Sequence, residues 1–200
     1  MALGPYLSVA GFHVWHAAQI ASMSPYALAR ASSEPRRFST VHNVHGQAVM
    51  MKLATNILVA TDFGEIAEIA LDYAVLLAAK LDAKVHVVHA IPTPELGIPE
   101  LGVAVASTVM ERLVREGQAS LDELIKRQHG RAQFGEPVLR IGDARDVVLQ
   151  VSHERAIDLI VMGTHGRQGL SRVLLGSVAE TVVRSARCPV LTVSGKAVWL

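Results

Sequence analysis

The stretch Asp158-Leu159-Ile160-Val161-Met162-Gly163-Thr164-His165-Gly166 is followed, after nine further residues, by Gly176-Ser177. Its apolar run predicts a buried strand, and an apolar-periodic segment after Gly176 predicts a helix. Glycines let the main chain approach a ligand closely. The free amides and the dipole of a helix start favour an anion. A strand, a glycine turn and a helix start in this order are typical of a phosphate-binding site.

Strands and helices are expected to alternate on both sides of this stretch. The sequence predicts strands at 56–61, 84–90, 137–141, 158–162 and 189–193, and helices at 65–81, 107–128, 143–155 and 177–186. Prolines and glycines predict a loop at 92–102. Such alternation implies an α/β fold, an open parallel sheet with helices on both faces. Ligands of these sheets bind outside the carboxyl ends of the strands, where the strand order reverses.

Composition narrows the class of protein. Half of the residues are hydrophobic but only 4% are aromatic, which suits an aliphatic parallel sheet. The net charge of +1 argues against a nucleic-acid partner. The lone Cys188 excludes an intramolecular disulfide and a cysteine-based zinc site. No apolar run reaches the ~20 residues that span a bilayer. We therefore expect a cytoplasmic protein with neither a membrane nor a nucleic-acid partner.

Residues 1–50 differ from the rest of the chain. They show no sustained apolar period and carry three arginines against one acidic residue, Glu34. The sequence predicts that residues 1–50 are a poorly ordered extension and that residues 51–200 form the domain. An organelle transit peptide is the alternative interpretation of this arginine- and serine-rich segment.

Residues 56–194 resemble the universal stress protein family along their whole length. The resemblance rests on the segments 57–63, 158–167, 175–180 and 188–193, and the spacing Gly-x2-Gly-x9-Gly-Ser matches the ATP-binding branch of that family. The resemblance implies a five-stranded sheet in the order 3-2-1-4-5, of the adenine nucleotide alpha-hydrolase type. It also implies ATP as the ligand, with or without Mg²⁺.

The resemblance assigns roles to particular residues. It places Asp62 near the adenosine, with Ala60 and Thr61 on the floor of the site and the backbone of Ala90 at the base. The glycine segment would lie under the ribose and phosphates. Its candidate residues are Gly163, His165, Gly166, Arg167, Gly176, Ser177 and Val178.

Structural roles compete with several of these assignments. Asp62 could instead cap the first helix. Ser177 and Glu180 fit a capping box, in which the two side chains satisfy the amides of their own helix. His165 and Arg167 could be solvated loop residues. His86 and His89 are an odd number of strand residues apart, so they should point to opposite faces and form no common metal site.

The sequence does not indicate a fast enzyme. It lacks the G-x-x-x-x-G-K-[ST] loop, and no carboxylate or histidine is placed by spacing to orient a water at a γ-phosphate. We expect no catalytic residue and at most slow ATP hydrolysis. The predicted function is an ATP-binding regulatory or sensor module of the stress response. The alternatives are an interaction protein of the same fold without nucleotide, and an alpha-hydrolase-type enzyme, which the acidic segment 62–65 disfavours.

The last strand suggests how the protein assembles. Pro189 to Val193 is rich in β-branched residues and uncharged, and the family order makes it an edge strand. Such edges are normally blunted or covered. The sequence therefore predicts a homodimer that pairs the two copies of this strand.

Overall fold

The computed structural model describes residues 7–9, 12–15, 38–42, 48–93, 99–164 and 175–194, with side chains from Leu53 onward except at 94–106. The first strands are β1 (Leu7–Val9), β2 (Phe12–Trp15), β3 (Phe38–His42), β4 (Ala48–Lys52) and β5 (Asn56–Ala60). They are followed by α1 (Glu65–Leu81), β6 (Lys84–Ile91), α2 (Pro99–Arg127), β7 (Gln133–Phe134) and β8 (Val138–Ile141). The last elements are α3 (Ala144–Glu154), β9 (Leu159–Gly163), α4 (Ser177–Ser185) and β10 (Val190–Val193).

The predicted parallel sheet and its strand order are confirmed. β5 lies between β6 and β9, β9 pairs with β10, and β8 pairs with the other side of β6, all in parallel. β8 takes the place expected for the third strand of the sequence, and the short strand β7 pairs with the same side of β6. The strand order reverses between β5 and β9, which makes their carboxyl ends the switch point of the sheet.

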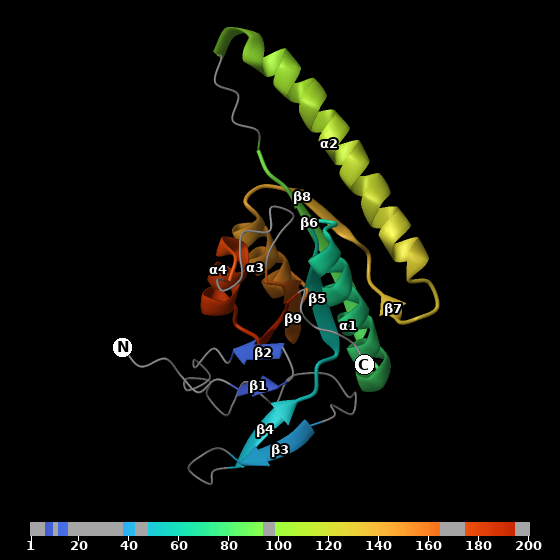
Figure 1. The fold of residues 1–200 in the computed structure, drawn as a ribbon, viewed down its shortest axis with the longest axis vertical. Coiled ribbons are helices and arrows are strands. Elements are labelled where there is room, and N and C mark those ends of the chain that lie inside the picture. Colours follow the sequence, from blue (N-terminus) through green and yellow to red (C-terminus); the bar gives the residue numbers. More distant parts are fainter. Residues whose placement is uncertain are drawn as a thin grey trace.

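Two apolar cores lie on opposite faces of the sheet (Figure 1). On one face, α1 and α2 pack on β5 and β6 around residues such as Val59, Val87 and Leu121. On the other face, α3 and α4 pack around Leu58 and Ile160. The aliphatic residues therefore form two cores, one between each layer of helices and the sheet. Of the helices that the structure describes, none is both long and apolar enough to traverse a lipid bilayer.

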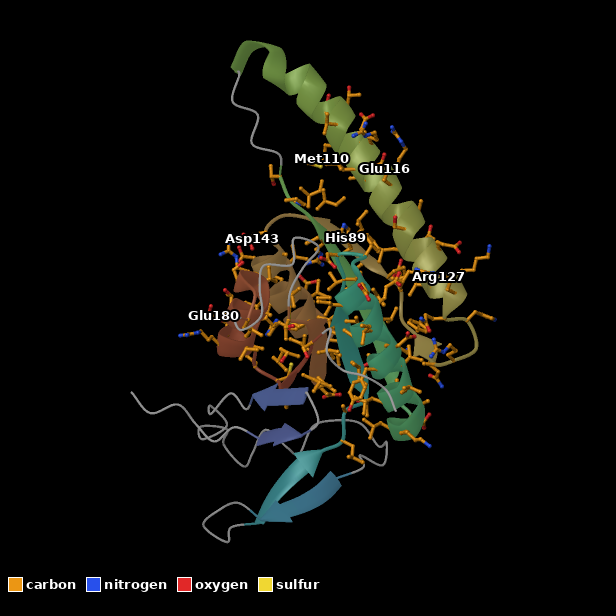
Figure 2. All side chains as sticks on the ribbon, in the orientation of Figure 1. His89, Met110, Glu116, Arg127, Asp143 and Glu180 are labelled. Carbon is orange, nitrogen blue, oxygen red and sulfur yellow. The ribbon has the colours of Figure 1, made fainter. Side chains whose placement is uncertain are left out.

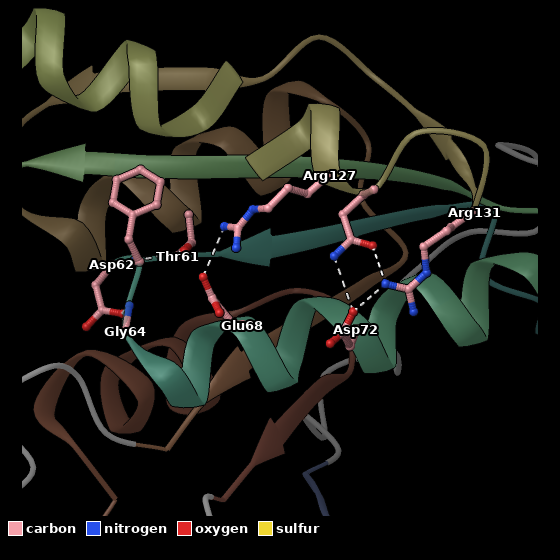
Figure 3. A network of polar contacts seen from close by, with 9 residues as sticks. Thr61, Asp62, Gly64, Glu68, Asp72, Arg127 and Arg131 are labelled. Atoms are coloured by element: carbon pink, nitrogen blue, oxygen red, sulfur yellow. Dashed lines mark hydrogen bonds and ion pairs between the residues drawn. The ribbon is translucent and has the colours of Figure 1, made fainter. Parts of the chain in front are cut away.

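Helix α2 is longer than the sequence predicts. It begins at Pro99, inside the expected loop at 92–102, and its first half extends beyond the sheet (Figure 1). Proline is favoured at the first helical position, where its missing N–H costs nothing, so Pro99 starts the helix instead of breaking it. At the other end of α2, Arg127 bonds Glu68 at 3.1 Å and Arg131 bonds Asp72 at 2.7 Å (Figure 3).

Part of the N-terminal extension joins the sheet, where the sequence predicted no regular structure. β2 pairs antiparallel with β10, and β1 pairs antiparallel with β2. β3 and β4 form a separate two-stranded sheet. Polar residues interrupt the apolar residues of β1, β2 and β3, which read LSV, FHVW and FSTVH, so these strands lack the continuous apolar run that indicated β5 and β9. The prediction that Pro189 to Val193 leaves a free edge is wrong, because β2 occupies that side of β10.

Candidate functional site

The carboxyl ends of β5, β6 and β9 bring several predicted site residues to one edge of the sheet. Ala60 lies in register with Val88 on β6 and with Met162 on β9. The amide of Thr61 donates to the carbonyl of Val88 at 2.9 Å. Gly163, which ends β9, is therefore level with Thr61, and Ala90 lies two residues beyond Val88 on β6.

The loop after β5 is held by its own side chains (Figure 3). The hydroxyl of Thr61 accepts from the amide of Phe63 at 3.0 Å, and Oδ1 of Asp62 accepts from the amide of Gly64 at 2.9 Å. Phe63 has a φ of 61°, a left-handed conformation that is uncommon for a bulky residue. Such conformations persist where the surroundings determine them, and they concentrate at functional loops.

Asp62 is not the N-cap of α1. That position belongs to Gly64, which offers no side-chain hydrogen bond to the helix. Asp62 instead closes the turn that precedes the helix, because it bonds the amide of Gly64 itself. The structural alternative for Asp62 is thus corrected from a helix cap to a turn, which fixes the position of the carboxylate at the edge of the candidate site.

His89 holds the same loop from the neighbouring strand, and sequence reasoning missed this role. Its Nδ1 lies 2.8 Å from the carbonyl oxygen of Thr61, and its ring centroid is 4.4 Å from that of Phe63, at 42° between planes. A carbonyl only accepts, so Nδ1 carries the proton. His89 belongs to β6, and its ring lies on the side of that strand that α2 covers (Figure 2). There Gly117 gives it room, since a Cβ at Gly117 would be 3.5 Å from the ring and 3.1 Å from Leu139.

The start of α4 forms the other half of the candidate site. The amide of Gly176 donates to the carbonyl of Thr164 at 2.7 Å, and the amide of Thr164 donates to that of Val193 at 2.8 Å. These bonds tie the helix start to the end of β9. Gly176 is the N-cap and makes no side-chain cap bond. By helix geometry, the amides of Ser177, Val178 and Ala179 have no acceptor within α4.

The predicted capping box of Ser177 and Glu180 is not formed. Because Gly176 takes the N-cap, Ser177 is the first helical residue and Glu180 is the fourth, one position too late to reach back. Glu180 pairs with Arg184 at 2.9 Å instead. Ser177 is exposed. The start of α4 therefore presents backbone donors that its own side chains do not cap.

The structure gathers most of the predicted site residues and leaves three outside its description. Eight lie at the carboxyl edge of the sheet or at the start of α4: Ala60, Thr61, Asp62, Ala90, Gly163, Gly176, Ser177 and Val178. His165, Gly166 and Arg167 lie outside the described residues. The described part of the chain contains no group of three or more histidine, cysteine or acidic residues arranged to hold a metal.

A cavity of 560 Å³ opens elsewhere, between the ends of α3 and α4. Its walls include His153, Arg187 and Cys188. Burial raises the pKa of the Cys188 thiol to about 11, so the thiol is protonated at neutral pH, as expected for an unreactive cysteine. The carboxyl ends of helices carry the negative end of the dipole. The start of α4, with the positive end of its dipole, is electrostatically the better place for a phosphate.

The fold is that of an open, parallel α/β protein with a candidate site at its switch point. A profile of the universal stress protein family matches residues 54–194. The chain belongs to the universal stress protein family.

Individual relatives agree with this assignment. Universal stress protein MJ0531 of Methanocaldococcus jannaschii is 33% identical over 142 residues, which cover 70% of this chain and 82% of that protein. The solved structure of hypothetical protein MJ0577 has a TM-score of 0.62 at 26% identity, with 72% of this chain and 98% of that chain covered. A family member from Burkholderia pseudomallei has a TM-score of 0.56 at 32% identity, with 70% and 95% covered.

Proposed function

We propose that this protein is an ATP-binding regulatory module of the stress response that retains ATP and hydrolyses it slowly at most. The adenosine would lie against Ala60, Thr61, Asp62 and the backbone of Ala90. The ribose and phosphates would lie over Gly163 and the segment that contains His165, Gly166 and Arg167. The terminal phosphates would meet Gly176, Ser177 and the amide of Val178. Mg²⁺ could accompany the phosphates.

The observation that carries the proposal is the start of α4 beside the switch point, which no side chain among the described residues caps. The bond from Gly176 to Thr164 holds these amides at the end of β9, next to the end of β5. Backbone donors at a helix start bind anions through both their N–H groups and the helix dipole. A nucleotide would supply phosphates for this end and a base to lie against the small side chains of Ala60 and Ala90 at the ends of β5 and β6.

Two features of the described residues favour slow ATP hydrolysis. Asp62 is the one carboxylate in the turn after β5, and its Oδ1 is engaged by the amide of Gly64. No described residue resembles the lysine that P-loop enzymes place at the β/γ-phosphates. The family match supports the class of protein, while ATP as its ligand is the step that we propose.

Mass spectrometry of the protein after gentle purification tests the proposal, followed by calorimetric titration with ATP. We expect ATP to copurify and to stay largely intact over minutes. Titration with cAMP belongs in the same experiment, because one solved universal stress protein of the same fold is in complex with cAMP. An empty protein that binds neither nucleotide would support an interaction protein without nucleotide. A turnover within the ~1–10³ s⁻¹ of ordinary enzymes would contradict the binding module.

A further inference from the structure

The edge of β10 needs a cover, whether or not nucleotide binds. With β2 in place all four of its residues are buried: Val190 and Leu191 expose 1% and 6% of their surface, and Thr192 and Val193 expose none. Leu191 and Val193 belong to the core on the α1 side, and Val190 to the core on the α4 side. A buried strand of this kind with an open edge is a template for pairing with another chain.

In this structure the cover comes from the chain's own N-terminal segment. β2 pairs with β10 over its full length, with Trp15, Val14, His13 and Phe12 opposite Val190, Leu191, Thr192 and Val193. β1 then forms the outermost strand, and it has only three residues. A very short edge strand is one of the devices by which natural sheets avoid edge-to-edge association.

The direction of β2 matters as much as its presence. β2 runs antiparallel to β10. Two copies of this chain related by a two-fold axis across β10 would also pair their strands antiparallel, because a two-fold axis makes the interface self-complementary. β2 thus satisfies the same row of backbone donors and acceptors, with the same strand direction, that a second copy would satisfy.

We propose that the strand Phe12–Trp15 is an intramolecular cover of the β10 edge, and that a second copy of this chain pairs there when the cover is displaced. A covalently attached segment competes at an effective concentration that commonly reaches the order of millimolar. A second copy at micromolar concentration therefore starts from a ~1,000-fold disadvantage. The covered chain is a monomer under ordinary assay conditions, and the N-terminal segment controls its assembly.

Two prolines within β2 test the cover in the full chain. Adjacent strand residues direct their amides to opposite neighbours, so His13→Pro with Val14→Pro removes one donor toward β10 and one toward β1. Light scattering at roughly tens of micromolar, well below the effective concentration of an attached segment, should give one 21.5 kDa chain for the parent and a dimer for this variant. Circular dichroism should show unchanged helix content. A variant that stays monomeric, or that forms open-ended aggregates, would overturn the proposal.

The matched control places the same change elsewhere in the extension. Ser39→Pro with Thr40→Pro disrupts β3, which pairs with β4 and not with the large sheet. This variant should remain monomeric. Dimers in both variants would show that any disturbance of the extension causes association, which contradicts a specific cover by β2.

A disulfide distinguishes cover within one chain from exchange between two. His13 and Thr192 are opposite each other in the pairing of β2 with β10. His13→Cys with Thr192→Cys, in a chain with Cys188→Ser, should form a bond within the chain that runs as a monomer on a non-reducing gel. A product of two linked chains would show that β2 is exchanged, and it would overturn the intramolecular cover.

Discussion

The loop after β5 and the start of α4 are the two halves of the candidate site. They differ in whether local side chains accept hydrogen bonds from the backbone amides. In the loop, Thr61 and Asp62 bond the amides of Phe63 and Gly64. At the start of α4, the N-cap Gly176 has no side-chain bond to offer. One half is closed by its own side chains, and the other presents donors that α4 does not use.

The difference indicates what each half contributes to binding. Hydrogen bonds to charged groups contribute about 1.5–3 kcal/mol each, so an anion that accepts from the amides at the start of α4 gains affinity there. The loop gains little from new hydrogen bonds but offers a fixed shape, because His89 and Phe63 hold it from the side. We therefore expect affinity to depend on the start of α4 and placement to depend on the loop.

Gly176→Val should have the largest effect. A branched side chain at the N-cap would occupy the space in front of the amides of α4, and we expect ATP affinity to fall by ~100-fold or more, about 2.7 kcal/mol. Gly64→Val is the matched comparison, because Gly64 is also an N-cap without a side-chain bond and is also extended. Calorimetric titration should find Gly64→Val within a few-fold of the parent. Equal losses of ATP affinity in the two variants would show that the start of α4 contributes no more to binding than the start of α1.

The second prediction concerns His89 as a positioning residue. His89→Leu removes the donor to Thr61 and the ring against Phe63, so the loop should loosen and ATP affinity should fall by roughly tenfold, about 1.4 kcal/mol. His89→Asn keeps an N–H donor close to the position of Nδ1 and should restore most of the affinity.

The bond itself can be checked without nucleotide. Nitrogen–proton correlation spectra of the imidazole should show the proton on Nδ1 of His89, as donation to the Thr61 carbonyl requires. A proton on Nε2 would refute the positioning role whatever the affinity of the variants. Correct tautomer together with full ATP binding by His89→Leu would confine the role of His89 to stability.

His86, the other histidine of β6, has no part in the candidate site and is useful to compare with His89. His86 is 6% exposed, its Nε2 lies 3.2 Å from Oδ1 of Asn56, and its buried Nδ1 has no hydrogen-bond partner among the described residues. Gly135 admits the ring, since a Cβ there would be 2.5 Å from Nδ1. Burial, then Arg155 and Lys84, lower the pKa of His86 from 6.5.

Acid should therefore destabilise the protein through His86. Because its pKa is lower in the folded than in the unfolded chain, the unfolded chain binds more protons below about pH 6.5, and the free energy of unfolding falls as pH falls through that range. Urea unfolding at pH 7, 6 and 5 measures the slope, and His86→Gln should reduce it. His153→Gln, at an exposed position of α3, is the control. An unchanged slope in His86→Gln would assign the acid sensitivity to other groups.

The parallel core could be predicted, and so could the place of most candidate residues at the carboxyl edge of the sheet or at the start of α4, because both depend on local signals. Apolar runs such as 57–59 and glycine turns such as Gly163 are visible in the sequence, and the strand order came from the family resemblance. The pairing of β2 with β10 could not be predicted, since the four residues of β2 carry too little pattern to indicate a partner about 180 residues away. The contact of His89 with Thr61 depends equally on the tertiary structure, and only its position on a strand was readable.

The smallest expected effect decides between a cap and a ligand contact at Ser177. If Ser177 were the N-cap, Ser177→Ala would cost ~1 kcal/mol of stability. It is instead the first helical residue, after Gly176, and Glu180 bonds Arg184. We therefore expect thermal unfolding of Ser177→Ala to match the parent, while ATP affinity falls a few-fold through loss of one hydroxyl contact, on the order of 0.5–1.5 kcal/mol. Asp143→Ala is the positive control for a lost cap, because Asp143 accepts from the amide of Arg145 at the N-cap of α3. A stability loss in Ser177→Ala as large as in that control, with ATP affinity unchanged, would return Ser177 to a purely structural role.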